Sequence, residues 1–262
     1  MTTPKSPVIR SLLECFGAVH CERERKGAVM NLNGVRLTWL GHATFRVETP
    51  GGKTIILDPW VMGNPMCPAN EKTVKKVDVM LVTHGHGDHI GDAVEIANKH
   101  KPVVVGIPEL CGWLGTKGVE NLAEMNKGGT QTVADIKVTM VHADHSCGIQ
   151  DGDQYIYGGE ACGYVVTFSN GPKIYHAGDT NVFGDMAIIH ELYAPDIMML
   201  PIGDHYTMGP REAAYACKLL KAKTVIPMHF GTFPVLVGKP SDLKRLVPGV
   251  DVVEMKPGET IG

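Results

Sequence analysis

The richest concentration of metal-binding side chains in the sequence is the segment Thr-His-Gly-His-Gly-Asp-His at residues 83–89. Three imidazoles and one carboxylate fall within six positions, and the glycines between them suit a turn that brings several side chains to one point. Histidine nitrogens and carboxylate oxygens together suit Zn²⁺, Mn²⁺, Fe or Ni, and no thiolate lies close by to favour a structural cysteine-rich site. The segment therefore predicts an open, reactive site with room for two divalent ions.

The elements around this segment must hold its side chains in place. Residues 77–82 form an apolar run that predicts a buried strand leading directly into the segment. Before it, residues 35–40, 43–48 and 53–57 predict short strands, with Pro-Gly-Gly at 50–52 as a hairpin turn. The entry to the domain is therefore predicted to be a β-meander.

Strands and helices alternate after the segment. The patterns predict helices at 91–99, 108–114 and 210–220, and strands at 103–107, 137–142, 164–169, 173–176 and 224–227. Further ligand candidates follow two of these strands, because Asp179 lies after 173–176 and His229 after 224–227. Open α/β sheets place their chemistry at such strand ends, so we expect these residues to join the site.

Length and composition favour one large α/β domain. The chain has 262 residues, 44% of them hydrophobic, which is enough for a substantial core. The ligand candidates run from His84 to His229 with no linker-like stretch between them, so one site needs most of the chain. We predict a single domain over residues 31–262 and an N-terminal extension over residues 1–30. The extension could be a tail, a helix packed on the domain or an oligomer contact.

Charge, hydropathy and cysteine usage exclude several classes of protein. The net charge of −3 and the isoelectric point near 6.4 give no electrostatic footprint for nucleic acid. No stretch reaches the run of about 18 apolar residues that a membrane span needs, and no signal-peptide pattern opens the chain. The seven cysteines are an odd number without a Cys-x-x-Cys pair, so we interpret them as reduced thiols. A cytoplasmic protein without a membrane or nucleic-acid partner is expected.

The string His84-x-His86-x-Asp88-His89 resembles the signature of the metallo-β-lactamase superfamily. The resemblance covers about residues 31–262, and it also rests on the motifs at residues 37–45, 56–65, 175–180, 200–210 and 227–234. These motifs are similar to a subgroup of metal-dependent hydrolases close to the ascorbate-6-phosphate lactonase branch. The resemblance implies an α/β fold, the four-layer αββα sandwich of the superfamily.

The resemblance also implies a set of metal ligands. The first metal would bind His84, His86 and a third histidine, the second would bind Asp88, His89 and His229, and Asp179 would bridge the two ions. Both His142 and His145 are candidates for the third histidine. In relatives the ligand directly precedes a small hydroxyl residue, which favours His145, and His142 then becomes a pocket residue or a core histidine.

Two adjacent ions can lower the pKa of a shared water and orient it as hydroxide for attack on a carbonyl carbon or phosphorus. Asp88 is the candidate for carrying the proton to the leaving group, and His205 for a proton donor or oxyanion contact. His42, Asp58 and Tyr206 are expected to orient ligands or touch substrate.

The predicted function is therefore hydrolysis of an ester, lactone or phosphoester bond of a small molecule, with zinc as the first expectation and manganese, iron or nickel as alternatives. Three other functions stay open. They are a nuclease or phosphodiesterase of the same fold, an iron-dependent redox enzyme, and a metal-binding sensor without turnover. Flavodiiron proteins carry a glutamate where this chain has His86, and nucleases carry a basic groove. Related proteins are often homo-oligomers, so the same is expected here.

Overall fold

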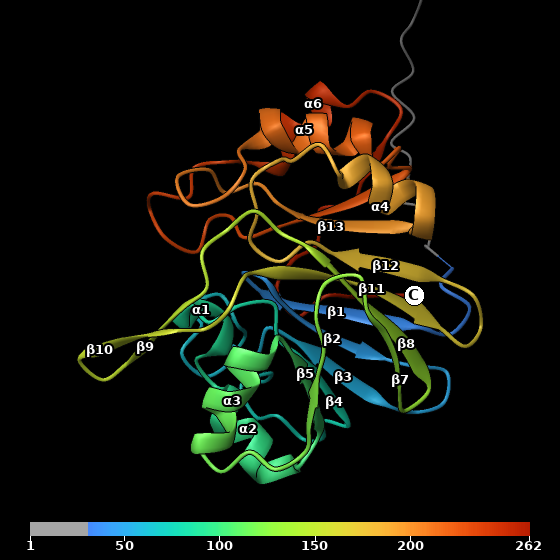
Figure 1. Ribbon diagram of the computed structural model, residues 1–262. Helices are drawn as coiled ribbons and strands as arrows, with labels where there is room; N and C mark the ends of the chain where they lie inside the picture. The colour runs from blue at the N-terminus through green and yellow to red at the C-terminus, as the bar shows by residue number, and fades with distance from the viewer. Residues whose placement is uncertain (1–30) are drawn as a thin grey trace, which may run out of the picture. The chain divides into compact units, whose positions relative to one another are not determined.

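Two seven-stranded sheets form the centre of residues 31–262, the part of the chain that the computed structural model describes (Figure 1). Residues 31–262 form one unit by their internal contacts. The predictions made for residues 1–30 lie outside the described residues.

The first sheet begins with the β-meander that the sequence predicts. Its strand order is β16-β1-β2-β3-β4-β5-β6, in which β1 to β3 pair antiparallel and β3 to β6 pair parallel. The strands are β1 (Arg36–Gly41), β2 (Thr44–Glu48), β3 (Thr54–Leu57), β4 (Val79–Leu81), β5 (Val103–Gly106), β6 (Leu122–Glu124) and β16 (Thr260–Ile261).

The second sheet has the same combination of antiparallel and parallel pairing. Its order is β15-β14-β13-β12-β11-β8-β7, antiparallel from β7 to β12 and parallel from β12 to β15. The strands are β7 (Thr130–Val133), β8 (Ile136–His142), β11 (Cys162–Phe168), β12 (Lys173–His176), β13 (Ile197–Pro201), β14 (Thr224–Met228) and β15 (Asp251–Val252).

Helices cover the outer face of each sheet. Figure 1 shows three helices beside the first sheet: α1 (Gly87–Ile90), α2 (Ala93–His100) and α3 (Pro108–Thr116). Three others lie beside the second: α4 (Met186–Tyr193), α5 (Pro210–Leu219) and α6 (Pro240–Leu246). The predicted four-layer αββα sandwich is therefore confirmed. No helix among these residues is long and apolar enough to cross a bilayer.

The inner faces of the two sheets pack against each other. The ring of Phe45 on β2 lies 5.9 Å from that of His176 on β12, and both side chains are buried. The hydroxyl of Tyr164 on β11 donates a hydrogen bond of 2.7 Å to the carbonyl of Val82, which directly follows β4. This contact ties the second sheet to the strand that leads into the metal-binding segment.

Several elements were not predicted. The hairpin β9 (Gly148–Asp151) and β10 (Gln154–Tyr157) forms a separate two-stranded sheet, which projects to the left in Figure 1. Its strands have four residues each, and Ile149 is the one buried residue among them, so no alternating pattern marks them. Within the segment 83–89 the structure also differs from a simple turn, because α1 begins at Gly87 and places Asp88 and His89 on one helical turn.

Candidate metal centre

The candidate metal centre lies where β4 ends. After Leu81 the chain has no regular secondary structure until α1 begins at Gly87, and His86 directly before the helix is extended. The backbone N–H groups of His89 and Ile90 donate to the carbonyl of His86, which fixes the turn between the two halves of the segment. Four predicted ligands therefore leave the backbone within one short and well-anchored stretch, and His84 and His89 are fully buried.

The first group of converging side chains consists of His84, His86 and His145. One nitrogen from each lies within 4.8 Å of those of the other two. Nε2 of His84 and Nδ1 of His86 are 3.1 Å apart, and His145 reaches them from the segment after β8. Between the two candidates for the third histidine, the geometry places His145 in this group.

The second group contains Asp88, His89 and His229, together with His42. His229 follows β14, so the two sheets meet at this group. Nε2 of His229 lies 3.8 Å from Oδ2 of Asp88. The fold thus brings the predicted ligands of the second metal together from positions that are far apart in the sequence.

Asp179 lies between the two groups. Its Oδ2 is 3.9 Å from Nε2 of His84 and 3.7 Å from that of His145, which belong to the first group. The same oxygen is 3.3 Å from Nε2 of His89 and 3.0 Å from that of His229, which belong to the second. One carboxylate oxygen therefore faces both groups, the position that a bridging ligand needs.

The centre also contains buried polar atoms without hydrogen bonds. Among the described residues, Nε2 of His89, both ring nitrogens of His229 and Oδ1 of Asp179 are buried and have no hydrogen-bond partner, although the Nε2 atoms lie close to Oδ2 of Asp179. Native proteins rarely leave such atoms unsatisfied. Imidazole nitrogens and carboxylate oxygens are the donor set of a divalent-metal site, so these residues fit metal ions.

Asp58 is hydrogen-bonded to His89, and its carboxylate also lies within 4.8 Å of a ring nitrogen of His84. Its Oδ2 accepts hydrogen bonds of 2.8 Å from Nδ1 of His89 and from the hydroxyl of Thr83, and its Oδ1 accepts one from the backbone N–H of Thr83. With Nδ1 of His89 held as the donor, Nε2 keeps its lone pair for a metal. The predicted role of Asp58 in orienting a ligand agrees with this geometry.

His42 holds Asp88 in a similar way. Nε2 of His42 lies 3.0 Å from Oδ2 of Asp88, and Nδ1 lies 2.8 Å from the hydroxyl of Thr232. Both ring nitrogens therefore have partners. The carbonyl of His42 also accepts the backbone N–H of His229, which connects this residue to a second member of the group.

Strained backbone marks several of these positions. His42, Asp58 and His229 have φ values of 56°, 47° and 54°, in the left-handed region that glycine favours. Such a conformation costs a non-glycine residue roughly 1 kcal/mol and persists where the surroundings impose it. Here it turns three polar side chains from strand ends towards one centre.

Burial sets the protonation of the first group. It is the main cause that lowers the pKa of His84, His86 and His145, and neighbouring histidines lower each pKa further. These imidazoles are therefore neutral at neutral pH. Neutral imidazole is the form that binds a metal ion.

His89 and Asp179 behave as an ion pair in the metal-free protein. Burial alone would lower the pKa of His89, but Asp179 and Asp58 raise it well above its usual value. Burial would likewise raise the pKa of Asp179, but His229 and His89 hold it well below. A metal ion at Nε2 of His89 would take the place of a proton, so we expect metal uptake to release protons.

Comparison with known proteins identifies the family to which this chain belongs. Residues 53–230 match the family described as the beta-lactamase superfamily domain. A protein of Koribacter versatilis named "UPF0173 metal-dependent hydrolase" is 71% identical over 231 residues, which cover 88% of this chain and 99% of the relative. The chain belongs to this superfamily and to its UPF0173 metal-dependent hydrolases.

Solved structures agree with this assignment. The metallo hydrolase Igni18 of Ignicoccus hospitalis is 36% identical, with a TM-score of 0.77 over 87% of this chain and 97% of its own. CmlA, a diiron beta-hydroxylase of Streptomyces venezuelae, has a TM-score of 0.68 at 16% identity, over 87% of this chain and 54% of its own. That identity shows a shared fold only. The predicted superfamily, fold and class of metal-dependent hydrolase are confirmed.

Three predicted residues of this hydrolase belong to neither of the two groups. His142 is exposed, with its ring against Phe183 and Nδ1 3.4 Å from Nζ of Lys127. His205 and Tyr206 occupy an exposed turn and pack against each other, and no hydrogen bond or ion pair between described side chains joins either to the centre. The catalytic role of His205 and the substrate contact of Tyr206 stay predictions.

The sequence interpretation gave no role to three hydroxyl residues that the structure places at the centre. Thr83 binds Asp58, Thr232 binds His42, and the hydroxyl of Ser146 lies 3.2 Å from Nε2 of His86. Thr83 and Ser146 each stand next to a predicted ligand in the sequence, and Thr232 lies three positions after His229. That proximity was the available signal, although the partner of each hydroxyl becomes clear only in the fold.

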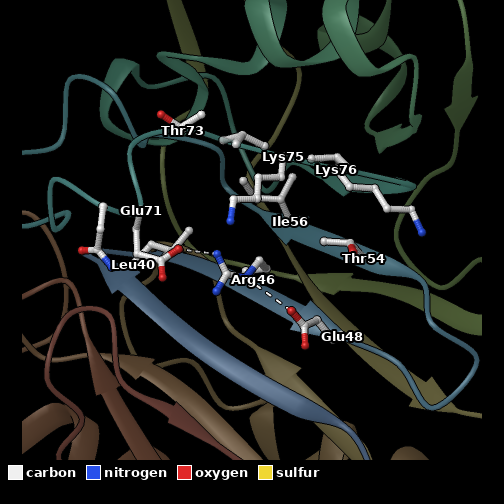
Figure 2. A pocket seen from close by; sticks show the side chains of 12 residues that line it. Leu40, Arg46, Glu48, Thr54, Ile56, Glu71, Thr73, Lys75 and Lys76 are labelled. Carbon is white, nitrogen blue, oxygen red and sulfur yellow. Dashed lines mark hydrogen bonds and ion pairs between the residues drawn. The ribbon is translucent and has the colours of Figure 1, made fainter.

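A hollow of about 440 Å³ lies elsewhere, between the outer face of β1 to β3 and residues 70–77. Figure 2 shows Arg46 reaching from this face to Glu71 and Glu48. The guanidinium is thus paired within the hollow, and no predicted ligand lines it. We interpret these ion pairs as covering the part of the outer face of the first sheet that no helix covers. We do not assign the metal-dependent reaction to this hollow.

Proposed function

We propose that the protein hydrolyses an ester, lactone or phosphoester bond of a small molecule with two divalent metal ions. The observation that carries the proposal is the position of Asp179, whose Oδ2 lies within 3.0–3.9 Å of four histidine nitrogens from two groups. A carboxylate shared in this way suits two ions better than one. The proposal rests equally on the family to which the chain belongs.

In this proposal the residues divide between the two ions as the resemblance to the superfamily implies. His84, His86 and His145 would hold one ion, Asp88, His89 and His229 the other, and Asp179 both. Nitrogen and oxygen donors without a thiolate suit zinc first, and manganese, iron or nickel as alternatives. Such a pair of ions supplies an activated water and stabilises negative charge on the substrate oxygen.

Asp88 is the proposed carrier of the proton. It lies on α1 at the edge of the centre, and its side chain keeps 28% of its exposure, so it can face both the reacting water and the substrate. Burial would raise its pKa, but the hydrogen bond with His42 and the neighbouring His89 keep the pKa below its usual value. The carboxylate is therefore ionised, which is the form that can take a proton, and the hydrogen bond with His42 keeps it in position.

The partner is a small molecule in this proposal. A net charge of −3 does not favour a nucleic-acid substrate, whose binding depends on phosphate contacts with basic side chains. The cytoplasmic location and the homo-oligomeric state stay predictions.

The test begins with elemental analysis of the protein purified without added metal. Hydrolysis of a lactone, a carboxylic ester, a phosphodiester and a lactam is then measured before chelation, after it, and after return of single metals. About two ions per chain, with a rate that chelation abolishes and metal restores, would support the proposal. Iron with oxygen uptake would favour the redox alternative, and bound metal without turnover would favour the sensor.

A further inference from the structure

The loop that follows β14 exposes an unusual amount of apolar surface. We name residues 230–238 the apolar loop, because it contains no charged residue and its side chains at Phe233, Val235 and Val237 are 37%, 43% and 62% exposed. Single exposed apolar residues are ordinary, but several in one short loop indicate a surface that binds a ligand or a partner.

The backbone of the apolar loop is firmly held. The N–H of Leu236 donates to the carbonyl of Phe233, and that of Gly231 to the carbonyl of Leu236, whose side chain is buried. At its far end the N–H of Gly238 donates to the carbonyl of Gly203. The exposed side chains are therefore presented by an ordered loop, and their exposure is not a result of missing backbone contacts.

The apolar loop lies directly beside the metal centre. The ring of Phe233 is 5.8 Å from that of His42, and it stacks on the indole of Trp60 at 6.0 Å with an interplanar angle of 28°. Trp60 in turn contacts the ring of His42 at 5.3 Å. His42 is the residue that holds Asp88, so the two aromatic rings stand one residue away from the proposed proton carrier.

We propose that Phe233 and Trp60 bind an apolar group of the substrate, an alkyl or aryl group next to the bond that is cleaved. The proposal rests on the hydrolytic function proposed above and names its substrate class. The exposed ring surface gains free energy when an apolar group covers it. A sugar phosphate in the same place would leave its hydroxyls facing carbon atoms, which costs free energy.

The test measures binding, so that it does not depend on which bond is cleaved. Acetohydroxamate and octanohydroxamate share a head group that chelates metal ions and differ in the length of the alkyl chain. Titration calorimetry gives their Kd values for the metal-loaded full chain. We expect octanohydroxamate to bind at least about tenfold more tightly, because part of its chain leaves water against the rings.

The variant Phe233→Ala should reduce this preference at least about threefold and leave the Kd of acetohydroxamate unchanged. Phe233→Leu should restore part of the preference, since it returns apolar area. Tyr215→Ala is the matched control, because Tyr215 is an exposed aromatic residue, 55% exposed, on α5. It should leave both Kd values unchanged.

Three outcomes would overturn the inference, and they can be told apart. Equal affinity of the two hydroxamates for the wild type would show that no alkyl group binds beside the metals. If Phe233→Ala kept the wild-type preference for octanohydroxamate but had a smaller mass than the wild type in size-exclusion chromatography, the loop would be a contact between copies of this chain. Failure of both hydroxamates to bind the metal-loaded chain would show that its metal ions are closed to a ligand, which overturns the proposed hydrolysis and with it the inference that rests on it.

Discussion

Asp58 Oδ2 lies 2.8 Å from Nδ1 of His89, and both side chains are fully buried. This hydrogen bond decides which ring nitrogen of His89 carries the proton in the neutral form. In that form the proton stays on Nδ1, and Nε2, which faces Asp179, keeps a lone pair that a metal ion could accept. The relationship therefore controls a ligand without touching the metal.

The substitution Asp58→Asn should weaken metal binding by about 10–100-fold. An amide can donate to Nδ1, which would move the proton of the neutral ring to Nε2 and remove a ligand lone pair. Asparagine also tolerates the left-handed backbone at this position, so the fold should persist. Metal affinity is measured by competition with a chromophoric chelator.

The control is Asp196→Asn, at a carboxylate that accepts a hydrogen bond from the backbone N–H of Lys173. It should leave metal affinity unchanged. Equal affinity in wild type and Asp58→Asn would contradict the role of Asp58.

Asp179→Ala should lower the metal content from about two ions per chain to one or none, and reduce hydrolysis by at least about 100-fold. The reason is that one oxygen of Asp179 serves both groups of histidines. Elemental analysis and the rate on the best substrate of the panel are compared with those of His142→Ala. The exposed His142 lies outside both groups, so its variant should match the wild type. Unchanged metal content in Asp179→Ala would exclude the bridging position.

Gly203→Ala should disturb the second group through packing alone. A Cβ at Gly203 would stand 2.1 Å from the carbonyl oxygen of His229, and a backbone atom cannot yield as a flexible side chain can. We expect a loss of about 1–3 kcal/mol in the free energy of unfolding and weaker binding of one ion. Urea unfolding and metal titration measure the two effects.

Gly184→Ala provides the comparison, because a Cβ there meets nothing within 4 Å. Its free energy of unfolding should stay within about 0.5 kcal/mol of the wild type. If the two variants behaved alike, the contact between Gly203 and His229 would not be the cause.

Acid should destabilise the metal-free protein between about pH 6.5 and pH 4. Burial lowers the pKa of His42 to about 4, from an ordinary value of 6.5. As the pH falls through this range, the unfolded chain takes up a proton that folded His42 refuses, so the free energy of unfolding falls. The loss from this residue reaches about 3 kcal/mol at the acid end.

Other titratable groups do not reverse this fall in the free energy of unfolding at acid pH. The lowered pKa values of His84 and His176 act in the same direction. The raised pKa of His89 adds a constant contribution here, because the residue is protonated in both states below pH 6.5. Urea unfolding at several pH values should give a shallower pH slope for His42→Gln than for wild type, and an identical slope would contradict the prediction.

Much of this architecture could be predicted from the sequence because hydrophobic periodicity and motif spacing are local signals. The strands from residue 35 to residue 57 and the helix that begins at Pro210 agree with their predicted positions within about two residues. The ligand candidates stood out by residue type and by their places after strands, whereas their division between two metals and the choice of His145 followed from the resemblance to the superfamily. These features depend on neighbours within a few residues, which a sequence displays directly.

What could not be predicted depends on contacts between distant segments. Thr232 faces His42 across 190 positions of sequence, and neither residue alone indicates the other. The β9–β10 hairpin forms between two short strands in which Ile149 is the one buried residue, which is too little to produce an alternating pattern. The exposure of Phe233 is likewise a property of the folded loop, since its apolar sequence would equally suit a buried segment.

The division of the ligands between the two sheets determines when the centre can form in a growing chain. The first sheet supplies His84 to His89 early, whereas His229 follows β14 and comes near the C-terminal end. During synthesis, the segment from His84 to His89 therefore lacks the ligand candidates of the second sheet until most of that sheet has been synthesised. For the proposed two-metal centre, the complete ligand set is therefore available only late in synthesis, and an ion bound earlier would be held by a partial and exposed ligand set.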